Sequence, residues 1–147
     1  MLSELLVATG MVALTVVIHG WGLALLAMIV RASEGARPLD WMSMRGITFS
    51  VGLALGLFLL HGIEIWCYAV LFQALGATSD FRAAVYFSTT TYSAIGFSDA
   101  DFHPRWLLVA GIEGINGLLL IGWSTAFFVA VMTSMLERVR ERPHTRH

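Results

Sequence analysis

The strongest constraint on the fold is a set of three long runs that carry almost no charge. Residues 5–30 contain no Asp, Glu, Lys or Arg. Residues 46–79 contain one such residue, Glu64, and residues 106–136 contain one, Glu113. Each run exceeds the roughly 20 residues that a helix needs to cross about 30 Å of hydrocarbon. The sequence therefore predicts an all-α membrane protein with three transmembrane helices in a lipid bilayer.

The overall composition excludes several other classes of protein. Charged residues make up 13% of the chain, whereas soluble domains carry about 25%. The net charge of −1 argues against nucleic acid as a partner. The single cysteine, Cys67, cannot form an internal disulfide. The sequence shows no set of nucleophile, base and orienting group that would indicate an enzyme. The N-terminal run also lacks the basic start that is typical of a signal peptide.

The distribution of arginine predicts how the chain is oriented in the membrane. Seven arginines fall in the segments 31–45 and 137–147, and only two, Arg82 and Arg105, fall on the opposite side. Cytoplasmic loops of membrane proteins carry an excess of Arg and Lys. We therefore expect a multi-pass protein of the cell membrane whose N-terminus is outside and whose C-terminus is cytoplasmic.

Between the second and third runs lies a segment that is too short to span the bilayer. Residues 81–92 predict a helix of about three turns, with Ser79 or Asp80 as its N-cap. The polar residues 93–99 follow it. Irregular backbone at membrane depth is stable only where protein buries it or where it lines a water-filled cavity. Residues 93–99 are therefore predicted to form a re-entrant loop that lines a pore.

This loop reads Ser-Ala-Ile-Gly-Phe-Ser-Asp. It resembles the selectivity filter of the potassium-channel superfamily, whose pattern is Thr-Thr-Val/Ile-Gly-Tyr/Phe-Gly-Asp. Ile95, Gly96 and Phe97 match this pattern, and Ser93 keeps a hydroxyl where the pattern has threonine. Asp99 also matches the pattern. It is either a charge that concentrates cations at the pore mouth or an ordinary acidic residue of a loop.

The resemblance extends over residues 46–136 and implies the pore unit of a small bacterial-type ion channel, with an outer helix, a pore helix, a filter and an inner helix. Residues 1–45 would add an N-terminal transmembrane helix and a cytoplasmic loop, and residues 137–147 a cytoplasmic tail. In such filters, rings of backbone carbonyls replace the hydration shell of an ion. One chain supplies one edge of each ring. The resemblance thus implies a homotetramer that conducts K⁺ and/or Na⁺, without a cofactor or a metal beyond the permeant cation.

Two positions make the filter divergent. Ala94 replaces a threonine whose hydroxyl lines the inner end of the family's filter, and Ser98 replaces a glycine. Glycine takes a left-handed backbone conformation without steric cost, whereas a residue with a Cβ pays about 1 kcal/mol or more. We therefore expect a passive cation channel with weakened or altered potassium selectivity. A channel-like scaffold that does not conduct is an open alternative.

Four polar residues are expected to support the pore helix: Thr90 and Thr91 within it, and Glu113 and Asn116 on the following transmembrane helix. An ionisable residue inside a membrane is a functional hypothesis by default. Glu113 could bond to the pore helix near Ser88, line the outer vestibule, or pair with an arginine near the interface. Asn116 lies on the same face and is expected to make hydrogen bonds between helices.

The third transmembrane run also carries a stripe of small residues, Ala110, Gly114 and Gly117. Small residues at such spacing allow the backbones of two membrane helices to approach closely. We expect another helix to pack on this stripe.

Three more ionisable residues lie near the middle of the first two runs: His19, His61 and Glu64. They could form a polar clasp between the two helices, or a proton-linked gate, because histidine titrates near physiological pH. They could also form a metal site or ligate a haem iron, which makes a small His-based redox or metal-binding membrane protein the alternative function. A Soret band in the purified protein would favour a haem.

Overall fold

The protein is described by a computed structural model that covers residues 1–36, 43–96 and 102–140. The secondary structure of these residues is helical, as the sequence predicted. The elements, in order, are α1 (Leu2–Ala36), α2 (Met44–Ala74), α3 (Phe81–Tyr92), the short 3-10 helix η1 (Pro104–Trp106) and α4 (Leu107–Arg140).

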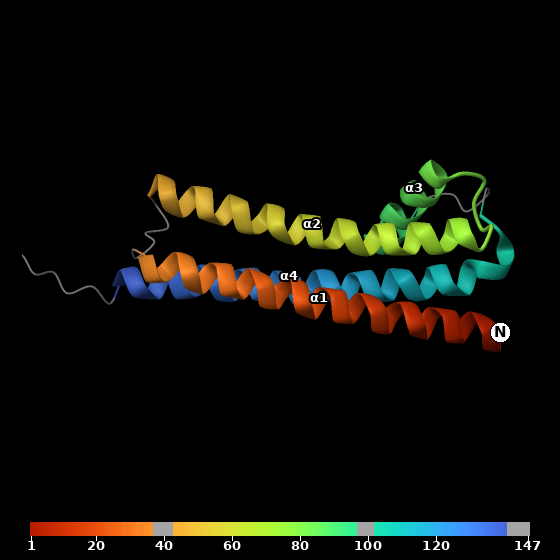
Figure 1. Cartoon of the computed structure of the whole chain (residues 1–147), viewed down its shortest axis with the longest axis horizontal. Helices are drawn as coiled ribbons and strands as arrows, with labels where there is room; N and C mark the ends of the chain where they lie inside the picture. Colours follow the sequence, from red (N-terminus) through yellow and green to blue (C-terminus); the bar gives the residue numbers. More distant parts are fainter. Residues whose placement is uncertain (37–42, 97–101, 141–147) are drawn as a thin grey trace, which may run out of the picture.

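The three long helices run side by side along the long axis of the molecule (Figure 1). The N-terminal end of α1 lies at the same end of the bundle as α3 and η1, and the C-terminal end of α1 and the N-terminal end of α2 lie at the other end (Figure 1). All three helices are long and apolar enough to cross a membrane. Large apolar side chains such as Trp21 and Phe58 are exposed on their outer faces, which suits contact with lipid rather than water. The protein is a multi-pass membrane protein.

Several of the predicted helix boundaries were wrong. The first helix continues to Ala36 instead of ending at residue 30, and the last continues to Arg140 instead of ending at residue 136. Both ends of the predicted loop 31–45 are therefore helical, because residues 31–36 belong to α1 and residues 44–45 belong to α2. The reason is that arginine and glutamate end a membrane span without ending a helix, since both are good helix formers. Residues 141–147 of the predicted tail lie outside the described residues.

The short helix α3 has the bounds that the sequence predicted, Phe81–Tyr92. Of the two candidate N-caps, Asp80 is confirmed, because its Oδ1 accepts a hydrogen bond of 2.9 Å from the backbone N–H of Ala83. Figure 1 shows α3 starting near the end of the bundle and running obliquely back toward its middle. This is the course of a helix that enters the membrane without crossing it.

Aromatic packing holds Phe102, which follows the filter segment in the chain, against α3 and α2. The ring of Phe102 stacks on that of Phe87 in α3, with ring centroids 4.0 Å apart, and meets Phe72 of α2 edge-on at 5.0 Å. The backbone N–H of His103 donates to the carbonyl of Ala77 over 2.8 Å. The segment between α3 and η1 is thus anchored at both of its ends.

Candidate functional site

The last turn of α3 packs directly on the small-residue stripe of α4. A Cβ atom added to Gly117 would overlap the carbonyl oxygen of Tyr92 and lie 2.8 Å from Cγ of its ring. A Cβ added to Gly114 would lie 3.2 Å from the carbonyl oxygen of Thr91. The helix expected on this stripe is therefore α3, and glycine at 117 is required because the Tyr92 backbone occupies the place of a side chain.

The backbone turns sharply where α3 ends. The N–H of Ala94 donates to the Thr91 carbonyl over 2.9 Å, and the N–H groups of Ile95 and Gly96 both donate to the Thr90 carbonyl, over 3.1 and 3.0 Å. Ala94 and Gly96 have left-handed φ angles of 56° and 65°. Glycine adopts this conformation freely, but alanine pays about 1 to 2 kcal/mol. The sequence located this kind of strain at Ser98, which lies outside the described residues, whereas the structure shows it at Ala94.

Ala94, Ile95 and Gly96 are exposed in the single chain, and the side chain of Ile95 has 67% of its surface free. The N-terminal part of the predicted filter therefore projects from the bundle after α3. The remaining predicted filter residues, Phe97, Ser98 and Asp99, lie outside the described residues.

The hydroxyl groups around the end of α3 bond mainly within the helix itself. Thr90 Oγ1 donates to the carbonyl of Phe87 over 2.9 Å, and Ser93 Oγ donates to that of Thr89 over 2.7 Å. Thr91 contributes its backbone and its methyl group to the contact with Gly114. These residues shape the end of α3, and the side-chain bonds from α3 to its neighbours come from other residues.

Glu113 makes one of these bonds. Its side chain is fully buried, and its Oε1 accepts a hydrogen bond from the hydroxyl of Ser88 in α3. Ser88 Oγ also lies 3.0 Å from the carbonyl oxygen of Ile65 in α2. Of the placements that the sequence left open for Glu113, this is the contact with the pore helix. The other carboxylate oxygen, Oε2, is buried without a hydrogen-bond partner among the described residues.

Asn116 holds different helices together. Its Nδ2 donates to Thr15 Oγ1 of α1 over 2.8 Å and to the Tyr68 hydroxyl of α2 over 3.3 Å. It makes the expected bonds between helices, but these bonds go to α1 and α2 and not to α3. Support of the pore helix by Asn116 is therefore indirect.

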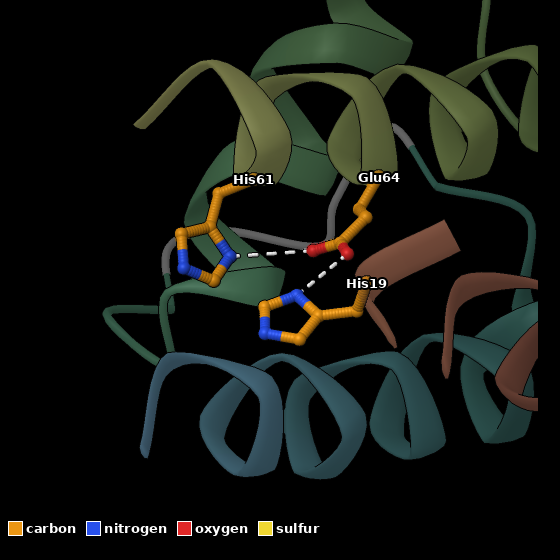
Figure 2. Close-up of side chains that lie close together, drawn as sticks. All are labelled: His19, His61 and Glu64. Atoms are coloured by element: carbon orange, nitrogen blue, oxygen red, sulfur yellow. Dashed lines mark hydrogen bonds and ion pairs between the residues drawn. The ribbon is translucent and has the colours of Figure 1, made fainter. Parts of the chain in front are cut away.

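His19, His61 and Glu64 come together in the structure, and Figure 2 shows both imidazole rings facing the carboxylate. His19 Nδ1 of α1 lies 2.8 Å from Glu64 Oε1, and His61 Nδ1 lies 3.3 Å from Oε2. The hydroxyl of Tyr92, the last residue of α3, donates to Glu64 Oε2. On the other side of the His19 ring, Nε2 lies 3.3 Å from Ser124 Oγ of α4. The polar clasp between α1 and α2 thus reaches all four α-helices.

Residues 57–134 match the model of a protein family described as ion channel. The match covers more than half of the chain. The chain belongs to the ion channel family. Comparison with curated proteins and with solved structures gave no match.

The family match identifies the part of this ion channel chain that is shared with other members of the family. Residues 57–134 include most of α2, all of α3 and most of α4, and therefore include the contact of α3 with Gly114 and Gly117. Helix α1 lies outside the match. Because the family consists of channels, the expectation that the protein is not an enzyme is also confirmed.

Four residues of the site were missed from the sequence. Tyr92 and Ser124 join the His–Glu clasp, and Thr15 and Tyr68 join Asn116. Thr15 carried a weak signal, because it lies four residues before His19 and therefore on the same face of α1. Tyr92 and Ser124 carried none, since only the packing of α3 and α4 brings them to Glu64 and His19.

Proposed function

We propose that this protein is a passive cation channel in which four copies surround a pore for K⁺ and/or Na⁺. The observation that supports this most directly is the position of α3, whose last turn lies on Gly114 and Gly117 and delivers Ala94, Ile95 and Gly96 to the surface of the bundle. This is the place where the resemblance puts the filter, in the region that matches the ion channel family.

A single chain is an incomplete pore. A ring of carbonyl ligands needs several copies of the filter segment around one axis, and cyclic symmetry is the usual arrangement of such copies. The exposed Ile95, together with Ile115 and Leu119 on α4, offers apolar surface beside the projecting segment. We assign this surface to the contacts around the pore axis and to the cavity behind the filter.

The charge distribution suits a cation. The C-terminal end of a helix carries a partial negative charge, and α3 has this end next to Ala94. Asp99 adds a full negative charge in the filter segment. In the proposed orientation the N-terminus of α1, α3 and the filter face outward, and the segment between α1 and α2 and the C-terminus face the cytoplasm of the cell.

Potassium selectivity is expected to be weak. Ala94 offers no hydroxyl to a dehydrated ion, and Ser98 adds a Cβ at a position where the family pattern has glycine. Backbone carbonyls of residues 93–97 would remain as ligands. Both substitutions reduce the number or the regularity of the ligands, and neither closes the pore by itself.

The test is the reversal potential of the purified protein in planar bilayers with K⁺ on one side and Na⁺ on the other. Current that reverses near zero is the expected result, and the double variant Ala94→Thr with Ser98→Gly should move the reversal toward the potassium equilibrium potential. A wild-type reversal already at that value would contradict weak selectivity. Absence of current in wild type and in the double variant, for protein that is helical and assembled, would support the non-conducting scaffold instead.

A further inference from the structure

The His–Glu clasp has the composition and geometry of a metal site. The ligand atoms of His19, His61 and Glu64 all lie within 4.8 Å of one another. They come from two helices and point to a common centre (Figure 2). Two imidazoles and one carboxylate are ligands that Zn²⁺ and neighbouring divalent transition ions prefer. We propose that His19, His61 and Glu64 bind a divalent transition-metal ion, with Zn²⁺ as the best-suited ion.

The distances between the ligand atoms are close to those that Zn²⁺ requires. Ligand bonds of about 2.1 Å in a tetrahedral site place the ligand atoms about 3.4 Å from one another. His61 Nδ1 and Glu64 Oε2 are 3.3 Å apart, and His19 Nδ1 and Glu64 Oε1 are 2.8 Å apart. All three ligand atoms lie within 4.8 Å of one another, so binding requires side-chain adjustments of about 1 Å and no movement of a helix. The Tyr92 hydroxyl, 3.0 Å from His61 Nδ1, or a water molecule can supply a fourth ligand.

Ser124 completes the environment of a metal-binding histidine. A histidine that binds a metal through one ring nitrogen usually donates the N–H of the other to an oxygen, which fixes the tautomer and the ring orientation. His19 has Nδ1 toward the centre and Nε2 3.3 Å from Ser124 Oγ. When the metal takes the Nδ1 lone pair of His19, the ring proton resides on Nε2 and is donated to Ser124 Oγ. Both ring nitrogens of His19 therefore have a partner.

Burial makes a metal ion electrostatically useful here. His19 and Glu64 are fully buried, and the residues that contact Glu64 include no Lys or Arg among those that the structure describes. A carboxylate without a compensating charge is costly in a low-dielectric interior, and a divalent cation supplies that charge. The side chain of His61 has 16% of its surface exposed. A metal ion would therefore enter the site at His61.

The site would give α1 a role in the protein. A metal bound by His19 and His61 joins α1, which lies outside the family match, to α2, and does so beside Tyr92 at the end of the pore helix. The proposal concerns metal binding and does not depend on whether the pore conducts or on its selectivity.

The experiment measures metal content and stability of full-length protein in nanodiscs after chelator treatment. Zn²⁺ is added alone, the unbound ion is removed by dialysis, and the metal is quantified by mass spectrometry. We expect about one Zn²⁺ per chain, a rise in the thermal unfolding midpoint on addition of Zn²⁺, and visible absorption of a tetrahedral complex when Co²⁺ replaces Zn²⁺. His61→Gln should abolish all three effects.

Matched controls separate this site from other histidines. The variant His103→Ala, His144→Ala, His147→Ala removes the three histidines outside the clasp and should retain the bound Zn²⁺. Ser124→Ala leaves all three ligands in place and should lower the affinity about 10- to 100-fold, which keeps the proposal testable if His61→Gln does not fold. A folded wild type that holds no Zn²⁺, unchanged binding in His61→Gln, or loss of binding in the triple variant would overturn the proposal.

Discussion

The two buried carboxylates among the described residues, Glu64 and Glu113, both contact the pore helix but differ in the number of their partners. Glu64 has three side-chain partners, from α1, α2 and α3. Glu113 has one, Ser88, and its Oε2 is unpartnered among the described residues. Beside Glu113, α3 is held chiefly by shape, through the glycines of α4. Beside Glu64, it is held by a polar network.

Both kinds of contact meet at Tyr92. Its backbone and ring pack on Gly117, while its hydroxyl bonds to Glu64. Because a packed backbone has no alternative position and a hydroxyl can turn to another partner, we expect the shape contact to be the more sensitive of the two. The end of the pore helix, and therefore the start of the filter, is positioned by its packing on α4 and adjusted by its hydrogen bond to α2.

The largest effect is expected from Gly117→Ala. The added methyl group would overlap the Tyr92 carbonyl oxygen, so α3 would have to move away from α4. Overpacking of this kind costs about 1 to 3 kcal/mol or more, and the displacement would also misplace Ala94 and Ile95. Unfolding in mixed micelles and bilayer current measure the two effects.

Gly122→Ala is the control for Gly117→Ala, because no atom lies within 4 Å of a Cβ added at Gly122. It should leave the current close to that of wild type and raise the free energy of unfolding by about 1 kcal/mol, because alanine favours a helix over glycine. Equal behaviour of the two variants would show that the contact of α3 with α4 does not depend on Gly117.

An intermediate effect is expected from Tyr92→Phe. This change removes the hydroxyl that donates to Glu64 and preserves the ring that packs on Gly117. Loss of one buried hydrogen bond to a carboxylate costs about 1.5 to 3 kcal/mol, and His61 Nδ1 remains 3.3 Å from the same oxygen. We expect an assembled protein with altered open probability and a lower unfolding midpoint. A double-mutant cycle with Glu64→Gln should show coupling between the two residues, and strict additivity would argue that the bond contributes nothing.

The smallest effect is expected from Gly114→Ala. The added Cβ would lie 3.2 Å from the Thr91 carbonyl oxygen, a tight contact that a small shift relieves. Replacing glycine by alanine inside a helix also contributes about 1 kcal/mol in favour of folding. The net change in the free energy of unfolding should be close to zero. A loss as large as that of Gly117→Ala would show that the whole stripe, and not one glycine, fixes α3.

The four α-helices could be predicted from the sequence alone, whereas η1 was not predicted. Three runs with almost no charge predicted three membrane-spanning helices, and the short segment capped by Asp80 predicted α3, because span length and capping depend on local chemistry. The filter pattern around Gly96 indicated an ion channel, and the family match agrees. The ends of α1 and α4 escaped prediction because charge marks the edge of a membrane and not the end of a helix.

Which side chains meet depends on how the helices pack. In the helix of a soluble protein, the polar face marks the side exposed to water and the apolar face marks the buried side. Lipid is as apolar as a protein core, so the two faces of a membrane helix look alike in sequence. The sequence therefore suggested a pairing of His19 with His61 and Glu64 but could not add Tyr92 or Ser124, which come from helices whose rotation is set by packing. The left-handed backbone at Ala94 was missed for a different reason. Ala94 follows the C-cap of α3, and the N–H groups of Ala94 and Ile95 bond to the carbonyls of Thr91 and Thr90, but the residue that usually marks this position in a sequence is glycine.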